Sequence, residues 1–231
     1  MFDIVRVGAL VAAAAPLGGL TSADVVPVLP ALRPLVPGGG LRPGAVVRVD
    51  DGSAGSAGSA SLRLALAAGA SHGGAWCAAV GLPELGVVAA AEMGVEPERL
   101  LLVDEPGRRW PDVVAALIDA VDLVLVRPPD RPAAAVTRRL TALARRGGCA
   151  LVVAGDWGGA QLRLRVDAAE WIGLGAGHGH LRGRRARVTA TGRGAAEPGR
   201  HAWLWLPGPD GAVSPAEAPA TGAHPSLEVV A

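Results

Sequence analysis

The sequence predicts an α/β protein with a mainly parallel central β-sheet that is flanked by helices and extended by C-terminal antiparallel strands. Short runs of Val, Leu and Ala lack polar alternation, which is typical of strands covered on both faces. Segments of helix length alternate with these runs, as they do in βαβ units. The 231 residues, 50% of them hydrophobic, are enough to bury a substantial core.

The predicted elements follow one another from residue 45 onward. Apolar runs predict five strands, at 46–50, 76–81, 100–104, 123–127 and 149–155. The segments between them predict four helices, at 59–70, 84–93, 111–120 and 133–146. After Gly155, residues 162–167 and 185–190 alternate apolar with charged side chains, and 202–206 form another short run. These three segments are expected to be half-exposed antiparallel strands that extend the sheet.

The domain organisation follows from composition. Residues 1–44 are predicted to form an N-terminal arm and a Pro/Gly-rich lead-in without regular elements, 45–207 the core domain, and 208–231 a disordered tail. Residues 8–20 resemble the apolar region of a signal peptide, but Asp3 accompanies Arg6 in the segment before them. We interpret this stretch as a cytoplasmic helix or poorly ordered arm, with a signal peptide as the alternative.

Charge and cysteine content narrow the functional classes. The net charge of +1 predicts no global attraction for nucleic acid or acidic membranes, so such binding would need a local patch. Apart from the apolar segment at 8–20, no stretch of the sequence approaches the roughly 18 consecutive apolar residues that a membrane-spanning helix needs. Cys77 and Cys149 adjoin apolar runs and are expected to be buried reduced thiols, which fits a cytoplasmic protein.

The strand at 46–50, a Gly-Ser loop and the helix at 59–70 have the layout of a phosphate-binding loop. The motif G-x-x-x-x-G-K-[ST] requires a lysine for the terminal phosphates and a hydroxyl for magnesium. In one frame Ala57 replaces the second glycine; in the other, Ser59 replaces the lysine and Ala60 the hydroxyl. All 22 basic residues other than histidine are arginine. The loop could still bind an anion through its N–H groups, or could serve only as a turn. Its candidate residues are Gly52, Ser53, Gly55, Gly58, Ser59 and Ala60.

Four stretches carry a resemblance to a known family: LPALRPLVPGGGLRPG (29–44), WCAAVGLPELGVVAAAEMGVEPERLLLV (76–103), VDLVLVRPP (121–129) and GLGAGHGHLRGRRARVTATGRGAAEP (173–198). They resemble the actinobacterial ImuA proteins, members of the ImuA/SulA group of RecA relatives. The resemblance covers about residues 28–210, is most specific at 76–103, and implies a RecA-like P-loop NTPase core.

The same resemblance implies that the catalytic groups are degenerate. Arg127, followed by Pro128, stands where the RecA strand ends in its magnesium-organising acid (Walker B). Glu84 matches the glutamate that activates water only with a one-residue shift. Together with the absent lysine, this predicts a protein that is not an enzyme and uses no cofactor.

The family's role implies a non-catalytic subunit of an SOS-induced translesion synthesis complex. The implied partners are an ImuB-like Y-family polymerase relative and, through it, a DnaE-type error-prone polymerase, with single-stranded DNA as a further candidate and no membrane. Two alternatives stay open. One is a SulA-like cell-division inhibitor, and the other is a divergent DNA-dependent NTPase in which Ser59 or Arg63 replaces the lysine.

An arginine cluster follows the glycine-rich residues 173–180. It comprises Arg182, Arg184, Arg185, Arg187 and Arg193. One interpretation is a nucleic-acid or partner contact, and the other is a solvated strand face whose arginines pair with local acids. Trp203 and Trp205 should share one face, either as core residues or as interface anchors. His178 and His180 form a poor zinc pattern, so no metal site is predicted.

Overall fold

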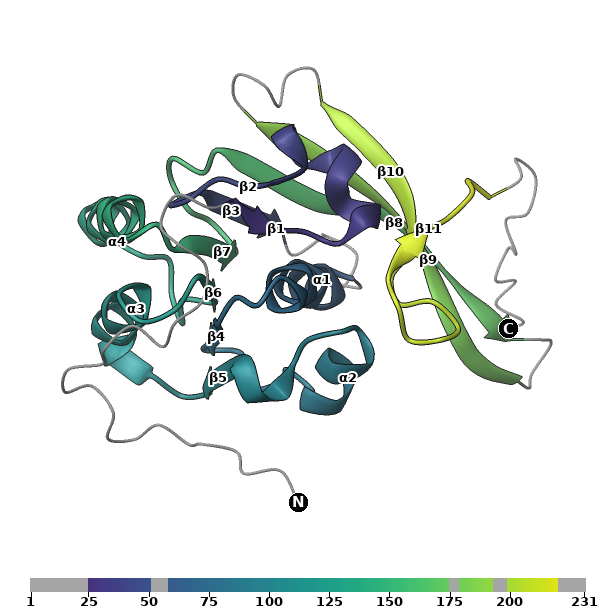
Figure 1. Ribbon diagram of the computed structural model, residues 1–231, viewed down its shortest axis with the longest axis horizontal. Helices are drawn as coiled ribbons and strands as arrows, with labels where there is room; N and C mark the ends of the chain where they lie inside the picture. Colours follow the sequence, from purple (N-terminus) through teal and green to yellow (C-terminus); the bar gives the residue numbers. More distant parts are fainter. Residues whose placement is uncertain (1–24, 51–57, 175–178, 193–198, 220–231) are drawn as a thin grey trace, which may run out of the picture.

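The computed structural model describes residues 25–50, 58–174, 179–192 and 199–219. Within these residues a nine-stranded sheet has the strand order β11-β10-β9-β8-β3-β7-β6-β4-β5 (Figure 1). Helices cover both faces of its parallel part, and its last strands are antiparallel. The α/β prediction, with a mainly parallel sheet and C-terminal antiparallel strands, is confirmed. The segment at 162–167, which was expected to be antiparallel, instead pairs in parallel with β3 and is antiparallel only to the strand that follows it.

Parallel pairing joins six strands. Their bounds are β3 (Val46–Asp50), β4 (Cys77–Val80), β5 (Leu100–Val103), β6 (Leu123–Val126), β7 (Ala150–Ala154) and β8 (Leu162–Leu174). Successive side chains point to opposite faces. Val47 and Val49 therefore belong to one hydrophobic cluster, and Val46 to another. In β4, β6 and β7 every residue is buried, which explains why these strands read as continuous apolar runs, whereas β8 alternates buried with exposed residues.

Four α-helices pack against this sheet. They are α1 (Ser59–His72), α2 (Val87–Glu92), α3 (Trp110–Ile118) and α4 (Ala134–Gly147). Helix α1 packs on one face, while α3 and α4 lie together on the other (Figure 1). All four coincide with predicted helices, although α2 is shorter because a turn at Leu82–Leu85 precedes it.

The Pro/Gly-rich lead-in contains short regular elements that the sequence did not predict. These are β1 (Val26–Pro27), β2 (Gly40–Leu41) and the 3-10 turns η1 (Pro30–Leu35) and η2 (Pro37–Gly39). Leu32 and Leu35 are fully buried in the cluster that includes α1. An added Cβ on Gly69 would lie only 2.5 Å from the Val28 Cα, so the lead-in runs directly over α1. Residues 26–41 thus share the core of the sheet.

Antiparallel strands complete the sheet. They are β9 (Gly179–Gly192), β10 (Arg200–Trp205) and β11 (Ser214–Pro215). Strands β8 and β9 are longer than predicted and project beyond the helices (Figure 1). Residues 208–219 of the predicted tail have a described conformation that includes β11, whereas 220–231 and the segment 8–20 lie outside the described residues. Among the described helices, none is both long and apolar enough to cross a membrane.

Candidate functional site

The phosphate-loop candidate lies between β3 and α1, and the structure describes its last residues. Gly52, Ser53 and Gly55 lie outside the described residues, whereas Gly58, Ser59 and Ala60 lie within them. Gly58 has a φ of +121°, and an added Cβ would lie 3.1 Å from Val166 on β8. The turn therefore requires glycine where the chain enters α1 beneath β8. Ser59 is buried and Ala60 is exposed, and neither brings a positive charge to the turn.

A buried arginine from β9 lies at this end of α1. Arg184 is only 4% exposed, and its Nη2 donates a hydrogen bond to the Ser61 Oγ at 2.8 Å. Its Nε donates to the Leu206 carbonyl at 2.8 Å, and its Cζ lies 5.1 Å from the Trp171 ring centroid. Burial lowers the pKa of Arg184. None of the described carboxylates forms an ion pair with it, so within the described residues the positive charge of Arg184 at the first turn of α1 has no acidic partner.

The degenerate Walker B position is occupied by an ion pair. Arg127 follows β6, and its Nη1 pairs with the Glu84 Oε1. The register of β4 and β6, in which Val80 lies opposite Val126, brings the two residues together. By the resemblance, these are the places of the magnesium-organising acid and the water-activating glutamate. Here the one candidate carboxylate is neutralised by the arginine that replaces the other.

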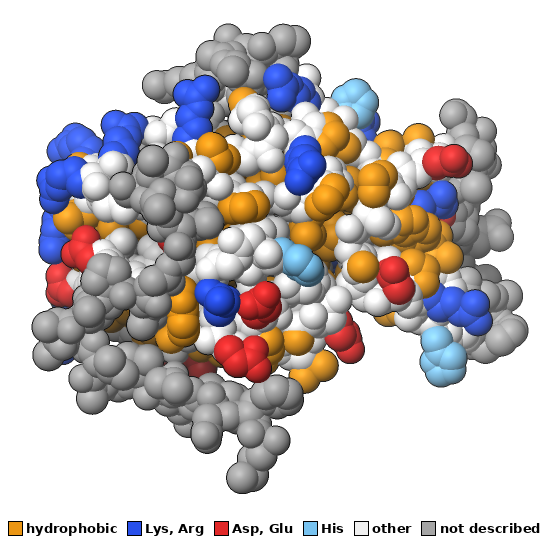
Figure 2. All heavy atoms as spheres, in the orientation of Figure 1, with side chains coloured by type: hydrophobic (Ala, Val, Ile, Leu, Met, Phe, Trp, Pro, Cys, Tyr) orange, Lys and Arg blue, Asp and Glu red, His pale blue; other side chains and the backbone are white. Residues whose placement is uncertain are grey.

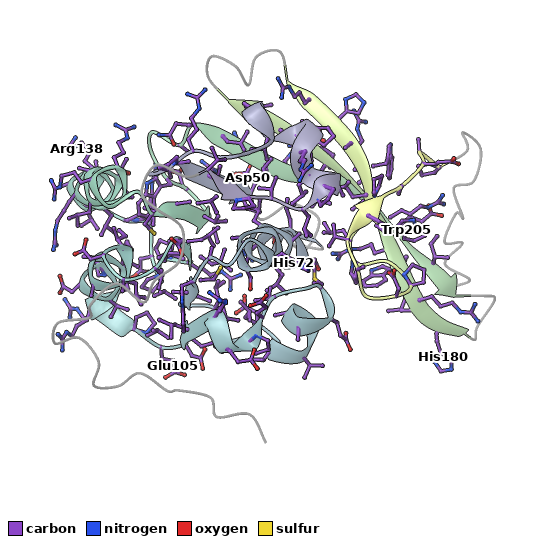
Figure 3. The ribbon with its side chains drawn as sticks, in the orientation of Figure 1. Asp50, His72, Glu105, Arg138, His180 and Trp205 are labelled. Atoms are coloured by element: carbon purple, nitrogen blue, oxygen red, sulfur yellow. The ribbon has the colours of Figure 1, made fainter. Side chains whose placement is uncertain are left out.

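Asp50, at the end of β3, was not selected from the sequence as a site residue (Figure 3). It is 6% exposed and accepts from the Arg48 Nε at 2.5 Å and from the Arg163 Nε. Arg48 also pairs with Asp156, at 2.7 Å. The signal in the sequence was an acid at the end of a buried strand, with one arginine two residues before it and another in the alternating segment at 162–167. Two guanidinium groups therefore occupy the space around this carboxylate.

Alternating residues of β8, β9 and β10 form a basic and aromatic sheet face. Arg187 lies opposite Trp203, and Arg185 lies opposite Trp205. The intervening residues of these strands, such as Val188 and Leu204, face the core with α1. We name this opposite side the arginine–tryptophan face, and it comprises Arg163, Arg165, Arg185, Arg187, Trp203 and Trp205.

Two of its arginines have acidic partners on β8. The Arg185 Nη2 donates to Glu170 at 2.8 Å, and the Arg165 Nε pairs with Asp167 at 2.6 Å. Arg185 also lies over the Trp205 ring, with 6.0 Å between its Cζ and the centroid, and no described residue accepts a hydrogen bond from its buried Nε. Arg187 is exposed and makes no ion pair with any described residue. This face combines aromatic surface with cationic groups.

The predicted arginine cluster does not form one patch. Arg184 points toward α1, while Arg185 and Arg187 point to the opposite face, because adjacent positions alternate along a strand. For Arg184, the interpretation as a solvated strand face is wrong. Arg182 is exposed, and Arg193 lies outside the described residues. The structure therefore divides the candidates between two different environments.

The remaining candidates lie apart from one another. His180 is at the far end of the projecting β8 and β9 strands, Trp205 is at their base, and His178 lies outside the described residues (Figure 3). Trp203 and Trp205 are half-buried and share one face, as predicted. In the described ranges, no three His, Cys, Asp or Glu side chains gather closely enough to hold a metal ion.

Comparison with known protein families finds a match over the larger part of the chain. Residues 34–159, more than half of the sequence, match the family described as the MT3502 N-terminal domain. The chain belongs to the MT3502 N-terminal domain family. The matching segment runs from the lead-in to a few residues beyond β7 and includes the Gly-Ser turn and Arg127. Arg184 and all residues of the arginine–tryptophan face follow residue 159 and therefore lie outside the matched segment.

The chain is also similar to one curated protein in sequence and to one solved structure in fold. The uncharacterized protein Rv3395c of Mycobacterium tuberculosis is 39% identical over 129 residues, which are 54% of this chain and 63% of that protein. The chain thus spans less than two thirds of its relative's length. The crystal structure of the RadB recombinase matches with a TM-score of 0.56 and 16% identity, covering 81% of this chain and 97% of RadB. This similarity confirms that the fold is RecA-like.

Proposed function

We propose that this RecA-like protein is a non-catalytic accessory subunit of an SOS-induced translesion synthesis complex. In this proposal it acts in the cytoplasm during repair of damaged DNA. It binds an ImuB-like relative of Y-family polymerases and, through it, a DnaE-type error-prone polymerase. The observation that supports a non-catalytic role is the ion pair between Arg127 and Glu84, in which an arginine replaces one catalytic acid and pairs with the single candidate for the other.

Phosphoryl transfer depends on positioning and on compensation of the phosphate charge. A lysine, a magnesium-binding hydroxyl and acid, and a water-positioning group normally provide both. Here Ser59 and Ala60 stand at the first two places in the matching frame, and Arg127 stands at the third. Magnesium would meet a guanidinium group at the end of β6 instead of a carboxylate. The strand, turn and helix would then serve the fold and not catalysis.

The arginine–tryptophan face is the surface that we assign to the polymerase relative. Tryptophan and arginine are the residue types that most often dominate binding energy at protein interfaces. Trp203 and Trp205 lie directly beside Arg187 and Arg185, so apolar area and charge are available at the same place. Single-stranded DNA is a further candidate for this face, since bases stack on aromatic rings beside cationic groups.

Affinity purification from damage-treated cells tests this assignment. The Arg165→Glu, Arg187→Glu double variant reverses two exposed charges and should lose the ImuB-like partner. The matched control is Arg138→Glu, Arg139→Glu, which reverses two exposed charges on α4. Arg138 lies at the far end of the molecule from Trp205, where basic side chains gather (Figures 2 and 3). Absence of the partner from purifications of the unaltered protein, with or without nucleotide, would refute the proposal. Loss of DNA binding alone would make the face a nucleic-acid site.

Arg184 favours a second candidate function, a divergent NTPase. Its guanidinium contacts Ser61 in the first turn of α1, where an arginine from β9 could compensate an anion in place of the lysine. Arg63, the other candidate, is buried inside α1. Equilibrium dialysis with ATP and a phosphate-release assay test this alternative. Saturable binding with measurable turnover, both lost in Arg184→Met, would favour it over the accessory role.

A further inference from the structure

A cavity lies at the edge of the sheet opposite to the Gly-Ser turn. It has a volume of about 470 Å³ and is lined by the lead-in, the first residues of β3 and β8, and the last turn of α4. Cavities of roughly 300–1,000 Å³ are typical of small-molecule sites. We propose that this cavity binds a small oxyanion with an apolar body, a function separate from the accessory role.

The apolar lining of the cavity favours a ligand that carries an apolar group. Pro37, Pro43 and Ala45 line the cavity and are only half-buried, so they present apolar surface to a ligand. Such walls favour transfer of an apolar group from water, by about 25 cal/mol for each Å² that is buried. A purely polar ion would gain nothing from these contacts. The ligand is therefore expected to carry an alkyl or aromatic body.

Two guanidinium groups in the lining favour a negatively charged ligand. Arg42 and Arg145 line the cavity, and its lining contains no aspartate or glutamate. Both arginines are exposed, and neither forms an ion pair within the described part of the chain. Guanidinium groups bind carboxylate and phosphate oxygens through paired hydrogen bonds. An uncompensated pair of arginines beside apolar walls fits an anionic head group.

The polar part of the cavity is held in place before any ligand binds. The Gln161 Oε1 accepts a hydrogen bond from the Val46 N–H at 2.6 Å, so its amide N–H₂ remains available as a donor. The Gly44 N–H donates to the Gly148 carbonyl at 3.0 Å. Gly44 has a φ of +69°, and an added Cβ would lie 2.5 Å from the Arg145 Cα. The lead-in is thus fixed against the end of α4, which positions Arg42 and Arg145 on one rim.

Titration calorimetry with four probes tests the proposal: octanoate, octyl phosphate, octanol and acetate. Saturable binding of octanoate or octyl phosphate is expected, with at least about tenfold weaker binding of octanol and acetate, because each lacks one half of the required chemistry. The two octyl anions distinguish a carboxylate from a phosphate ligand. No partner protein is present, so the result is independent of the accessory role.

Variants locate the binding. Arg42→Gln and Arg145→Gln should each weaken binding of the better anion by about tenfold or more, since a hydrogen bond to a charged group is lost. Arg146→Gln is the matched control, because Arg146 is in the same exposed helix turn but does not line the cavity. Ala45→Phe should abolish binding by filling the cavity, with circular dichroism checking that it folds. The proposal is overturned if neither octyl anion binds saturably, or if Arg146→Gln weakens binding as much as Arg145→Gln does.

Discussion

Replacement of Arg184 by methionine should destabilise the protein, because this arginine joins β9 to the start of α1. Methionine retains much of the apolar stem but removes the guanidinium group. The change breaks the hydrogen bonds to the Ser61 Oγ and the Leu206 carbonyl, each 2.8 Å long, and the contact with the Trp171 ring. It leaves the Leu206 carbonyl without this donor.

The magnitude follows from opposing contributions. Two hydrogen bonds from a charged group contribute about 3–6 kcal/mol, and a partly buried cation–π contact contributes about 1 kcal/mol. The variant also avoids the cost of burying a charge, which is several kcal/mol for one ion and is the reason that the pKa of Arg184 is lowered. The difference predicts a loss of about 2 kcal/mol in the free energy of unfolding.

Equilibrium urea denaturation followed by circular dichroism measures this loss. Arg182→Met provides the control, because Arg182 is on the same strand but exposed, and its replacement should change stability by less than about 0.5 kcal/mol. If Arg184→Met unfolds with the same free energy as the Arg182 variant, Arg184 does not join β9 to α1 as described.

Three further predictions concern the thiols, Asp50 and Gly58. Burial raises the pKa of Cys77 from 9.0 to about 12 and also raises the pKa of Cys149, so alkylation at pH 8 should be about a thousandfold slower than in urea. Because the folded-state pKa is raised, stability should fall as the pH rises from 9 toward 12, and an unchanged stability in that window would contradict this. Asp50→Asn weakens the pairing with Arg48 and Arg163 and should cost about 2 kcal/mol by urea denaturation, whereas a change below about 0.5 kcal/mol would show that the pairing contributes little. Gly58→Ala should cost about 1–3 kcal/mol from its φ of +121° and its contact with Val166, more than Gly74→Ala, where φ is +86° and no atom lies within 4 Å; equal costs would exclude the contact with β8.

The parallel sheet could be predicted because its strands are buried on both faces. The run at 46–50 contains Val, Arg and Asp but is bounded by proline and glycine, and β3 has the predicted bounds. The ends of β8 and β9 were missed. In β8 a bulge between Val166 and Ala168 shifts the register, so the residues beyond it face opposite to what alternation from 162–166 would predict. That shift places Trp171 on the same face as Arg184, which no strand periodicity could indicate.

The candidate site was less predictable because it depends on pairing between distant segments. Alternation along β9 alone would have separated Arg184 from Arg185, and this signal was present in the sequence. The contact of Arg184 with Ser61 was not, since the two residues are 123 positions apart. The ion pair of Arg127 with Glu84 likewise depends on the register of two strands. In the lead-in, the proline content predicted an irregular segment, so the burial of Leu32 and Leu35 was not predicted.

The most direct test of a non-catalytic accessory role is the affinity for a purified ImuB-like partner, measured by titration calorimetry with and without ATP and magnesium. The ion pair at Arg127 and the absence of any lysine predict the same dissociation constant, within about twofold, in both conditions. Association that appears only with ATP, or that becomes more than about tenfold tighter with it, would contradict the account, since nucleotide would then be binding and changing the partner surface.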